Sequence, residues 1–242
     1  MDVSFITPFP EIVKTVLNSS ILDKAKDRID IKYNIINLFD FLENTNGRID
    51  DYPFGGGKGM ILKPAPIFNA FNTIKNPGRV IYPSPDGKLL NHNLAKDLSN
   101  EKSLIFICGH YKGIDQRVRD NIVTDEISIG DYVVTGGELP ALIILDSAVR
   151  LIKGVLNKYE SAETDSFYDK LLDGPHYTRP QNYNGLLVPD VLVSGNHKKI
   201  NDWFYNERVK KTKERRKDLL VINANSNGEK KWIKYMMQQK MI

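Results

Sequence analysis

The stretch EISIGDYVVTGGELPA, residues 126–141, joins three patterns that together indicate the fold. Its first part, residues 126–134, predicts a strand, and a glycine-rich segment follows it. Residues 138–156 then form a long apolar run that predicts a helix, with Pro140 in the first turn, where proline is tolerated. A strand that leads through a loop into a helix is the building unit of α/β folds.

The residues before this stretch repeat the alternation of strands and helices. The segment PSPDG at 83–87 predicts a turn that ends the preceding strand. We therefore expect an α/β domain with a mainly parallel sheet, in which ligands bind where strands end. The expected strands are 3–7, 29–38, 79–82 and 104–108, and the expected helices are 11–22, 66–74, 92–98 and 114–121.

The composition is typical of a globular protein, with 242 residues of which 41% are apolar and 26% charged. No stretch approaches the roughly 18 apolar residues that a membrane helix needs. The first residues lack the basic segment and apolar run of a secretory signal. The one cysteine, Cys108, excludes an internal disulfide and a multi-cysteine metal site. We expect a cytoplasmic protein of one large or two small domains, without a membrane partner.

Charge is distributed unevenly along the chain. Residues 196–242 carry 13 lysines and arginines against 5 acidic residues, whereas the net charge of the whole chain is only +4. A polar segment at 157–170 predicts a linker between a mildly acidic part and this basic part. Helices are expected around 200–217 and at 230–241. The basic part favours a polyanionic partner, although lysine-rich helices also commonly form a merely solvated surface.

Three loops rich in glycine and polar residues are candidate binding segments. Their sequences are FGGGKGM (54–60), CGHYKGID (108–115) and SIGDYVVTGGELP (128–140). None matches the Walker loop G-x-x-x-x-G-K-[ST] or the dinucleotide fingerprint G-x-G-x-x-G. Tight turns alone would explain one such loop. Three of them after successive strands favour a site for a ligand without a phosphate tail.

Longer motifs connect the chain to a known family. They are IDDYPFGGGKGM (49–60), YPSPDGK (82–88), CGHYKGIDQRV (108–118), EISIGDYVVTGGELPA (126–141), DSF (165–167), LLDGPHYTRP (171–180) and VLVSGNHKKI (191–200). On these motifs the chain resembles the bacterial tRNA (guanine-37-N1)-methyltransferases, the TrmD family of the SPOUT superfamily, over nearly its whole length. The resemblance implies a SPOUT-type mainly parallel sheet with a C-terminal trefoil knot, a small all-α C-terminal domain, and a homodimer with a shared active site.

The same resemblance implies a division of labour and a cofactor. Residues 1–157 would form the domain that binds S-adenosylmethionine (AdoMet), 158–170 a flexible linker, and 171–242 a helical domain that binds tRNA. A neutral, glycine-rich pocket suits AdoMet because this ligand has no phosphate. The implied AdoMet-binding residues are Tyr82, Ser84, Pro85, Gly109, Tyr111, Gly113, Ile129, Gly130, Asp131, Tyr132, Val133, Val134, Gly136, Gly137 and Pro140.

The chemistry of guanine N1 methylation requires a base and a cation. N1 carries a proton that must leave, and negative charge then builds on O6. The resemblance assigns the base to Asp165 and the cation to Arg150. Without the family, Asp165 would be interpreted as a solvated linker carboxylate, and Arg150 as the i,i+4 partner of Asp146 on the long helix.

The remaining implied residues would contact the anticodon stem-loop of tRNA. His176 and His197 lack the spacing of zinc ligands, so no metal site is predicted. The resemblance also implies a dependence of the reaction on Mg²⁺, for which the chain shows no dedicated carboxylate cluster. The implied tRNA-binding residues are Asp51, Gly55, Gly57, Gly59, Asp173, His176, Tyr177, Arg179, Ser194 and His197, with the basic stretch at 198–217.

One segment departs from the commonest family pattern. CGHYKGID has His110 and Lys112 where arginine and glutamate are more usual, so a carboxylate contact at the methionine end of the pocket is in doubt. Two other functions stay open: an RNA-binding protein that has lost catalysis, and a SPOUT enzyme acting on another RNA position, such as a ribose 2′-OH. The implied catalytic residues argue against the first, and LLDGPHYTRP with the basic C-terminal part argues against the second.

Overall fold

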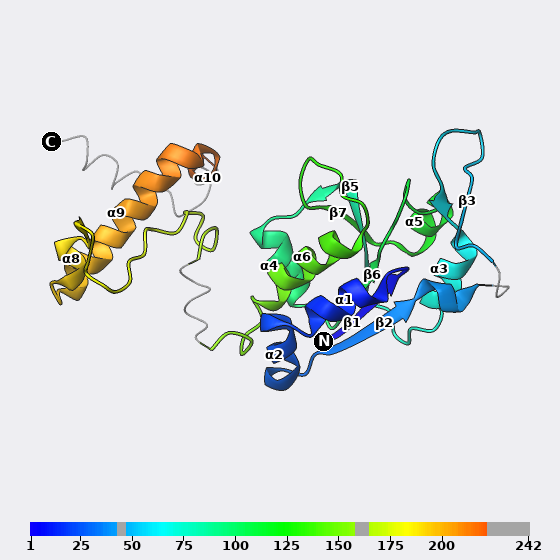
Figure 1. The fold of residues 1–242 in the computed structure, drawn as a ribbon, viewed down its shortest axis with the longest axis horizontal. Coiled ribbons are helices and arrows are strands. Elements are labelled where there is room, and N and C mark those ends of the chain that lie inside the picture. Colours follow the sequence, from blue (N-terminus) through cyan, green and yellow to red (C-terminus); the bar gives the residue numbers. More distant parts are fainter. Residues whose placement is uncertain (43–46, 158–164, 222–242) are drawn as a thin grey trace. The chain divides into compact units, whose positions relative to one another are not determined.

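The computed structural model describes residues 1–42, 47–157 and 165–221 (Figure 1). The chain divides into two compact units, Met1–Tyr159 and Glu160–Ile242. The elements of the first unit are β1 (Asp2–Thr7), α1 (Pro10–Leu17), α2 (Ser20–Arg28), β2 (Lys32–Asn37), η1 (Leu38–Phe41), β3 (Asp50–Asp51), β4 (Ile61–Leu62), α3 (Pro64–Phe71), β5 (Arg79–Leu89), α4 (His92–Ser99), β6 (Ser103–Ile107), α5 (Gln116–Ile122), β7 (Asp125–Ser128) and α6 (Glu138–Val149).

A five-stranded parallel sheet with the order β2-β1-β6-β5-β7 forms the centre of the first unit. Strand β6 is apolar from Leu104 to Ile107, and β1 is buried from Val3 to Thr7, because both faces of each strand are covered, as is usual in parallel sheets. On one face, Phe5 and Phe106 stack with their ring centroids 5.0 Å apart, beneath α1, α2, α4 and α6. On the other face, Ile105 and Ile107 pack against α3 and α5. The expected α/β class and mainly parallel sheet are confirmed.

Strand β5 departs from the expected pattern at PSPDG. The strand continues to Leu89 instead of ending at Tyr82, so the predicted turn is wrong. Pro83 and Lys88 both pair with Ile127 of β7, which leaves residues 84–87 looped out of the sheet. Proline and glycine therefore produce a bulge within a strand, because the chain resumes its pairing with β7 after the interruption.

Further boundaries differ from expectation, and the expected helix 11–22 is two separate helices, α1 and α2. Strand β7 ends at Ser128 rather than at Val134, and helix α6 ends at Val149, short of residue 156. Val133 and Val134 are exposed on the loop that follows β7, so their β-branched side chains cover loop surface and do not continue the sheet.

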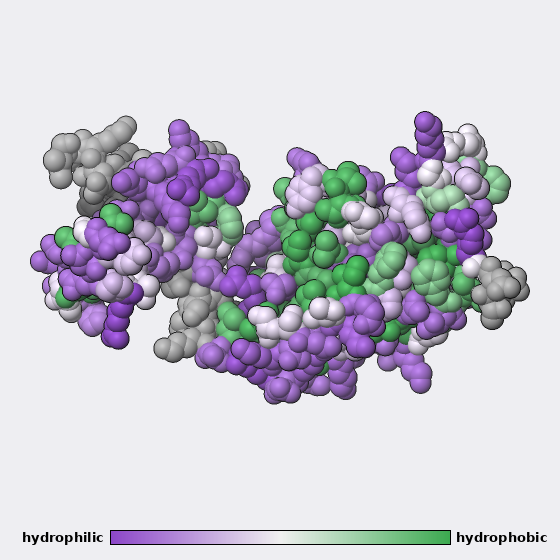
Figure 2. Space-filling view, viewed as in Figure 1, coloured by the Kyte–Doolittle hydropathy of each residue, from purple (hydrophilic) through white to green (hydrophobic). Residues whose placement is uncertain are grey.

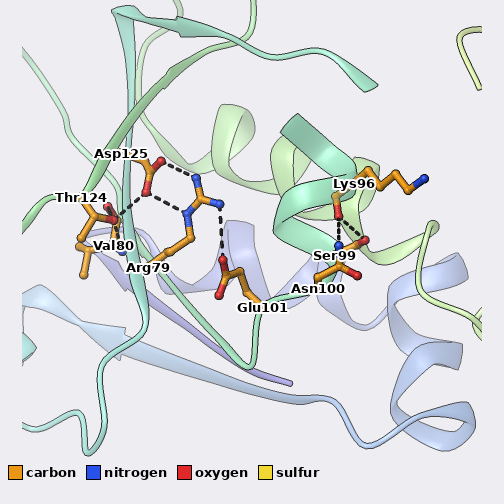
Figure 3. A network of polar contacts seen from close by, with 8 residues as sticks. All are labelled: Arg79, Val80, Lys96, Ser99, Asn100, Glu101, Thr124 and Asp125. Carbon is orange, nitrogen blue, oxygen red and sulfur yellow. Dashed lines mark hydrogen bonds and ion pairs between the residues drawn. The ribbon is translucent and has the colours of Figure 1, made fainter. Parts of the chain in front are cut away.

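The start of β5 is bound to its neighbours by ion pairs, shown in Figure 3. Arg79 donates from Nε to Asp125 Oδ2 at 3.0 Å and from Nη2 to Oδ1 at 2.5 Å, and its Nη1 lies 3.5 Å from Glu101. The Thr124 hydroxyl donates a hydrogen bond to Asp125 Oδ2 at 2.7 Å and accepts one from the Val80 N–H. These contacts fix β5 against β7 and against the turn that precedes β6.

The second unit contains β8 (Asn182–Tyr183), β9 (Leu186–Leu187), α8 (Asp190–Val193), α9 (His197–Arg215) and α10 (Lys217–Val221). The expected helix around 200–217 is confirmed as α9. The expectation of an all-α unit is wrong, because β8 and β9 form an antiparallel pair around the Asn184–Gly185 turn. The expected helix at 230–241 and most of the expected linker lie outside the described residues.

We expect Asp125→Asn to lower the free energy of unfolding by about 1–3 kcal/mol, because it removes a carboxylate that three donors share. Arg79 depresses the pKa of Asp125 in the folded protein. The stabilisation is therefore present above the unfolded pKa of about 3.9 and is lost as the pH falls through the lower folded value. Urea unfolding between pH 7 and pH 3 measures this: the difference between parent and variant should shrink in acid, and a difference that is constant with pH would contradict it.

Candidate active site

A cavity of about 480 Å³ lies where β5, β6 and β7 give way to their loops. These strands are neighbours in a parallel sheet, so their carboxyl ends meet at one edge, where ligands of α/β proteins bind. Its size falls in the range of small-molecule sites, about 300–1,000 Å³. The cavity is lined by Tyr82, Pro83, Ser84, Pro85, Asp86, Gly109, His110, Tyr111, Lys112, Gly113, Arg119, Ile127, Ser128, Ile129, Gly130, Tyr132, Val133, Val134, Thr135, Gly136, Gly137 and Pro140.

The structure brings the implied AdoMet-binding residues together around this cavity, with one exception. Asp131 is exposed and does not line it. Motif reasoning did not assign eight of the lining residues to ligand binding: Pro83, Asp86, His110, Lys112, Arg119, Ile127, Ser128 and Thr135. All of these except Arg119 lie inside the quoted motifs, so their place in a motif is the sequence feature that indicates them as candidate ligand contacts. Arg119 lies one residue beyond CGHYKGIDQRV and had no such signal.

A buried carboxylate lies beside the cavity at the start of α6. Glu138 is 2% exposed, and its Oε1 accepts a 2.6 Å hydrogen bond from the Thr7 hydroxyl at the end of β1. Its Oε2 lies 3.4 Å from His110 Nε2, and the His110 ring packs on Phe9 with centroids 4.6 Å apart. The Glu138 side chain thus connects the end of β1, the loop after β6 and the first turn of α6.

Two of the cavity loops touch through their backbones. The Gly137 N–H donates to the Gly109 carbonyl at 2.8 Å. A Cβ added at Gly137 would lie 2.7 Å from the Gly109 nitrogen and 2.8 Å from Cys108 Cα, which leaves no room for a side chain. Cys108 itself is 1% exposed, and burial raises the pKa of its thiol.

The third glycine-rich loop differs from the other two. It joins the short antiparallel strands β3 and β4, so the expectation that all three loops follow successive strands of the sheet is wrong. Asp51 and the glycines at 55, 57 and 59 are exposed there, and Asp51 lies 3.5 Å from Lys63. The loop approaches the cavity at Lys112, whose backbone N–H donates a hydrogen bond to the Met60 carbonyl at 3.0 Å. The Lys112 side chain also packs against Gly59, because a Cβ added there would lie 2.8 Å from Lys112 Cγ.

The two implied catalytic residues lie in different units. Arg150 caps the C-terminus of α6. Burial raises the pKa of Asp146 one turn earlier, and Arg150 opposes this rise. Asp165 begins the described part of the second unit, where its carbonyl accepts a hydrogen bond from Tyr168. The i,i+4 proximity of Arg150 and Asp146 that the sequence suggests is thus present.

The implied tRNA-binding residues of the second unit form two groups. His176 Nε2 lies 2.7 Å from Asp173, whose carbonyl accepts from Lys211 at 2.9 Å, and the exposed Tyr177 lies against Trp203. Arg179 is exposed in the same segment. Ser194 ends α8 and His197 begins α9, and both are exposed. These groups present aromatic and basic side chains to solvent on one small unit.

A metal site and a membrane-spanning helix are both absent among residues 1–42, 47–157 and 165–221. No three histidine, cysteine, aspartate or glutamate side chains in these ranges gather as a metal site would require. Within the same ranges, no helix combines the length and apolar character needed to cross a membrane.

An α/β unit with a cavity beyond three neighbouring strand ends, and without a phosphate-binding loop, has the architecture of the small-molecule-binding domains of the α/β class. Sequence comparisons then identify the family. The model of the family described as tRNA (Guanine-1)-methyltransferase TrmD matches residues 1–222. The chain belongs to this family of tRNA (guanine-N1)-methyltransferases.

Individual relatives agree with this family. The tRNA (guanine-N(1)-)-methyltransferase of Clostridioides difficile (strain 630) is 53% identical over 220 residues, which cover 88% of this chain and 95% of the relative. The proteins of the same name from Bacillus licheniformis and Bacillus subtilis (strain 168) are 49% and 47% identical over 237 residues, covering 96% of this chain and 98% of each relative.

We expect Thr7→Val to lower the free energy of unfolding by about 1–3 kcal/mol, because Glu138 and the Phe9 N–H both lose their bond to the Thr7 hydroxyl. Thr7→Ser is the matched control: it keeps the hydroxyl and loses one methyl group, worth roughly 0.8 kcal/mol. Urea unfolding of both variants measures the difference. A loss for valine no larger than that for serine would show that the hydroxyl does not stabilise the start of α6.

Proposed function

We propose that this protein transfers the methyl group of AdoMet to N1 of guanine at position 37 of tRNA. The observation that carries the proposal is the cavity at the ends of β5, β6 and β7, in a chain of the tRNA (guanine-N1)-methyltransferase family. When bound, AdoMet supplies an electrophilic methyl group on its sulfonium. The chain's own residues bind it, orient the guanine and remove the N1 proton.

The residues around the cavity fit AdoMet chemically. Tyr132 and Val134 are partly exposed and offer apolar surface for an adenine ring to cover. The glycine-rich segments at 109–113 and 130–137 bring backbone polar groups besides the Gly137–Gly109 pair to the cavity wall, and no phosphate-binding loop is present among the lining residues. A ligand with an apolar ring, polar ring edges and no phosphate matches such a surface.

Asp165 is the proposed base and Arg150 the proposed cation. A carboxylate within hydrogen-bond reach of guanine N1 accepts its proton, and a guanidinium beside O6 stabilises the charge that develops there. Arg150 and Pro140 lie at opposite ends of α6, ten residues and about 15 Å apart at the helical rise. Arg150 is therefore far from the cavity of its own chain, which supports a site completed by a second subunit.

A homodimer with a shared active site is accordingly part of the proposal. Leu139 and Ile143 lie one turn apart on α6 and are 55% and 47% exposed. Phe9 and Ile12, at the start of α1, are also exposed. Figure 2 shows apolar surface gathered over α6, α1 and the neighbouring loops of this unit. Exposed apolar surface of this kind is typical of protein–protein interfaces.

The trefoil knot of the SPOUT superfamily is proposed for the loops around the cavity. Its support is the return of the loop after β7 to the loop after β6, through the Gly137–Gly109 hydrogen bond and a bridge between His110 and Gly136. Knots are rare exceptions among protein folds, so the family carries this inference.

Contacts with the anticodon stem-loop complete the proposal. Asp51 and the glycines at 55, 57 and 59 would lie beside the target guanine. Tyr177 and His176 would stack on unpaired bases, and Arg179 would bind phosphate or a guanine edge. Ser194, His197 and the basic side chains of α9 would grip the stem. A cytoplasmic location and a dependence of the reaction on Mg²⁺ are also part of the proposal, and both rest on the family.

The direct test uses AdoMet with a labelled methyl group and tRNA carrying guanine or adenine at position 37. We expect label on guanine-37 tRNA only, recovered as N1-methylguanine after digestion. Equal labelling of both tRNAs would overturn the position and base assignment. Label on a ribose would indicate the other SPOUT reaction, and no label on any tRNA would indicate a binding protein.

We expect Asp165→Asn to lower the methyl-transfer rate by about 10²–10⁴-fold, because an amide does not accept the N1 proton. Its AdoMet affinity, measured by calorimetry, should stay within twofold of the parent, since the carboxylate acts on the guanine. A loss of AdoMet binding would show instead that Asp165 supports the fold of the pocket.

We expect Ile143→Glu to shift the protein from dimer to monomer in sedimentation experiments, because a charge on the exposed face of α6 opposes burial against a second copy. Methyl transfer should fall with the dimer fraction if the site is shared. Lys24→Glu, on the exposed face of α2, is the control for a new carboxylate elsewhere on the surface and should stay dimeric. A monomeric parent protein, or a fully active monomeric variant, would overturn the shared site.

A further inference from the structure

Arg119 connects β5 and β7, two of the strands whose ends form the cavity, although no motif singled it out. It lies on the short helix α5, lines the cavity, and its side chain is only 21% exposed. Its guanidinium contacts one residue from β7, one from the bulge of β5, and the aromatic ring that precedes this bulge.

The first contact fixes the guanidinium itself. Arg119 donates from Nε to Glu126 Oε1 at 2.8 Å and from Nη2 to Oε2 at 2.5 Å. Glu126 belongs to β7, so this two-point contact holds Arg119 to the sheet in one orientation.

The second contact reaches the cavity wall. Arg119 Nη2 also donates to Asp86 Oδ2 at 2.7 Å, and the Ser84 hydroxyl bonds to the other carboxylate oxygen of Asp86. Both residues belong to the segment 84–87, which is looped out of the sheet and has no paired residues in β7. Hydrogen bonds from Arg119 and Ser84 lower the pKa of Asp86 from its ordinary value.

The third contact is with Tyr82. The Arg119 guanidinium carbon lies 5.4 Å from the centroid of the Tyr82 ring, within cation–π range. Tyr82 in turn supports the loop after β6: a Cβ added at Gly109 would lie 2.9 Å from its ring, and one at Gly113 would lie 2.9 Å from its hydroxyl. A shift of Tyr82 would therefore move the 109–113 segment of the cavity.

We propose that Arg119 is a positioning residue for AdoMet, which holds the bulge at 84–87 and the Tyr82 ring against β7 in the shape that binds the cofactor. The inference rests on the proposed function, because it takes AdoMet as the ligand of the cavity. Arg119 acts through Asp86 and Tyr82. It raises affinity by ordering the wall before the ligand arrives, which removes that ordering cost from binding.

The test compares Arg119→Met with Arg119→Lys and a control on the same helix. Methionine keeps an unbranched apolar stem but loses all three contacts, so we expect AdoMet to bind about tenfold or more weakly in calorimetry. Lysine keeps the charge and loses the two-point geometry, and should fall between parent and methionine. Arg117→Met removes the same charge from an exposed arginine that pairs only with Asp115 among the described contacts, and should bind AdoMet as the parent does.

Kinetics separate positioning from a general loss of structure. We expect the KM for AdoMet to rise while kcat at saturating AdoMet and the KM for tRNA stay within twofold. Asp86→Asn should weaken AdoMet binding as well, and the double variant Arg119→Met/Asp86→Asn should lose less binding free energy than the sum of the two single losses, because both residues act through one contact.

Two outcomes would overturn the inference: AdoMet affinity within twofold of the parent in Arg119→Met, or a lower kcat with an unchanged KM for AdoMet. If Arg119→Met does not fold, Arg119→Lys carries the same comparison. The parent protein distinguishes the two proposals. A parent that does not bind AdoMet contradicts the proposed function, whereas a parent that binds it and an unaffected variant contradict only the role of Arg119.

Discussion

The parallel pairing of β5 with both β6 and β7 is the constraint on which the rest of the first unit depends. It places three carboxyl-terminal strand ends side by side, so that loops from distant parts of the sequence converge on one cavity. The pairing is stable because the neighbouring strands β1 and β6 are buried on both faces, beneath α1, α2, α4 and α6 on one side and α3 and α5 on the other (Figure 1). The ion pairs of Arg79 add a polar anchor at the opposite end of β5 (Figure 3).

Beyond the strand ends, the loops lack the regular hydrogen bonds of strand pairing, and contacts that involve side chains hold them in place. Glu138 joins Thr7 and His110, Arg119 joins Glu126 and Asp86, and Gly137 allows direct backbone contact with Gly109. Most of these contacts cross between segments that are far apart in sequence, whereas Arg119 and Glu126 are only seven residues apart. The cavity is thus shaped by a few polar contacts on a rigid apolar base, which is the usual way that α/β proteins combine a stable sheet with variable sites.

Sequence patterns predict the sheet better than the loops, for physical reasons. Strands buried on both faces are typically near-continuous apolar runs, which makes β6 recognisable in the sequence and β1 less so, because Ser4 interrupts it. The PSPDG segment has the same composition whether it ends a strand or bulges out of one, and only the pairing with Ile127 decides between these outcomes. The sequence pattern favours a strand in the loop after β7, because Val133 and Val134 are β-branched, although both side chains are exposed. Arg119 was not predicted, since in sequence it resembles Arg117, whose ion pair is largely exposed. The candidate ligand contacts came from family resemblance, because backbone-lined pockets leave little trace in residue type.

The burial of Cys108 has a practical consequence. The only cysteine of the chain directly follows β6, and the backbone of Gly137 packs against its Cα. Burial raises the pKa of the Cys108 thiol, so the thiolate forms less readily. Thiolates are the species that react with alkylating dyes, so the native protein is in effect free of reactive thiols. A cysteine introduced on the exposed surface of the second unit would be labelled selectively in the otherwise unaltered protein. Fluorescent or spin probes can therefore report on this unit, while slow labelling of Cys108 itself would record the opening of the sheet.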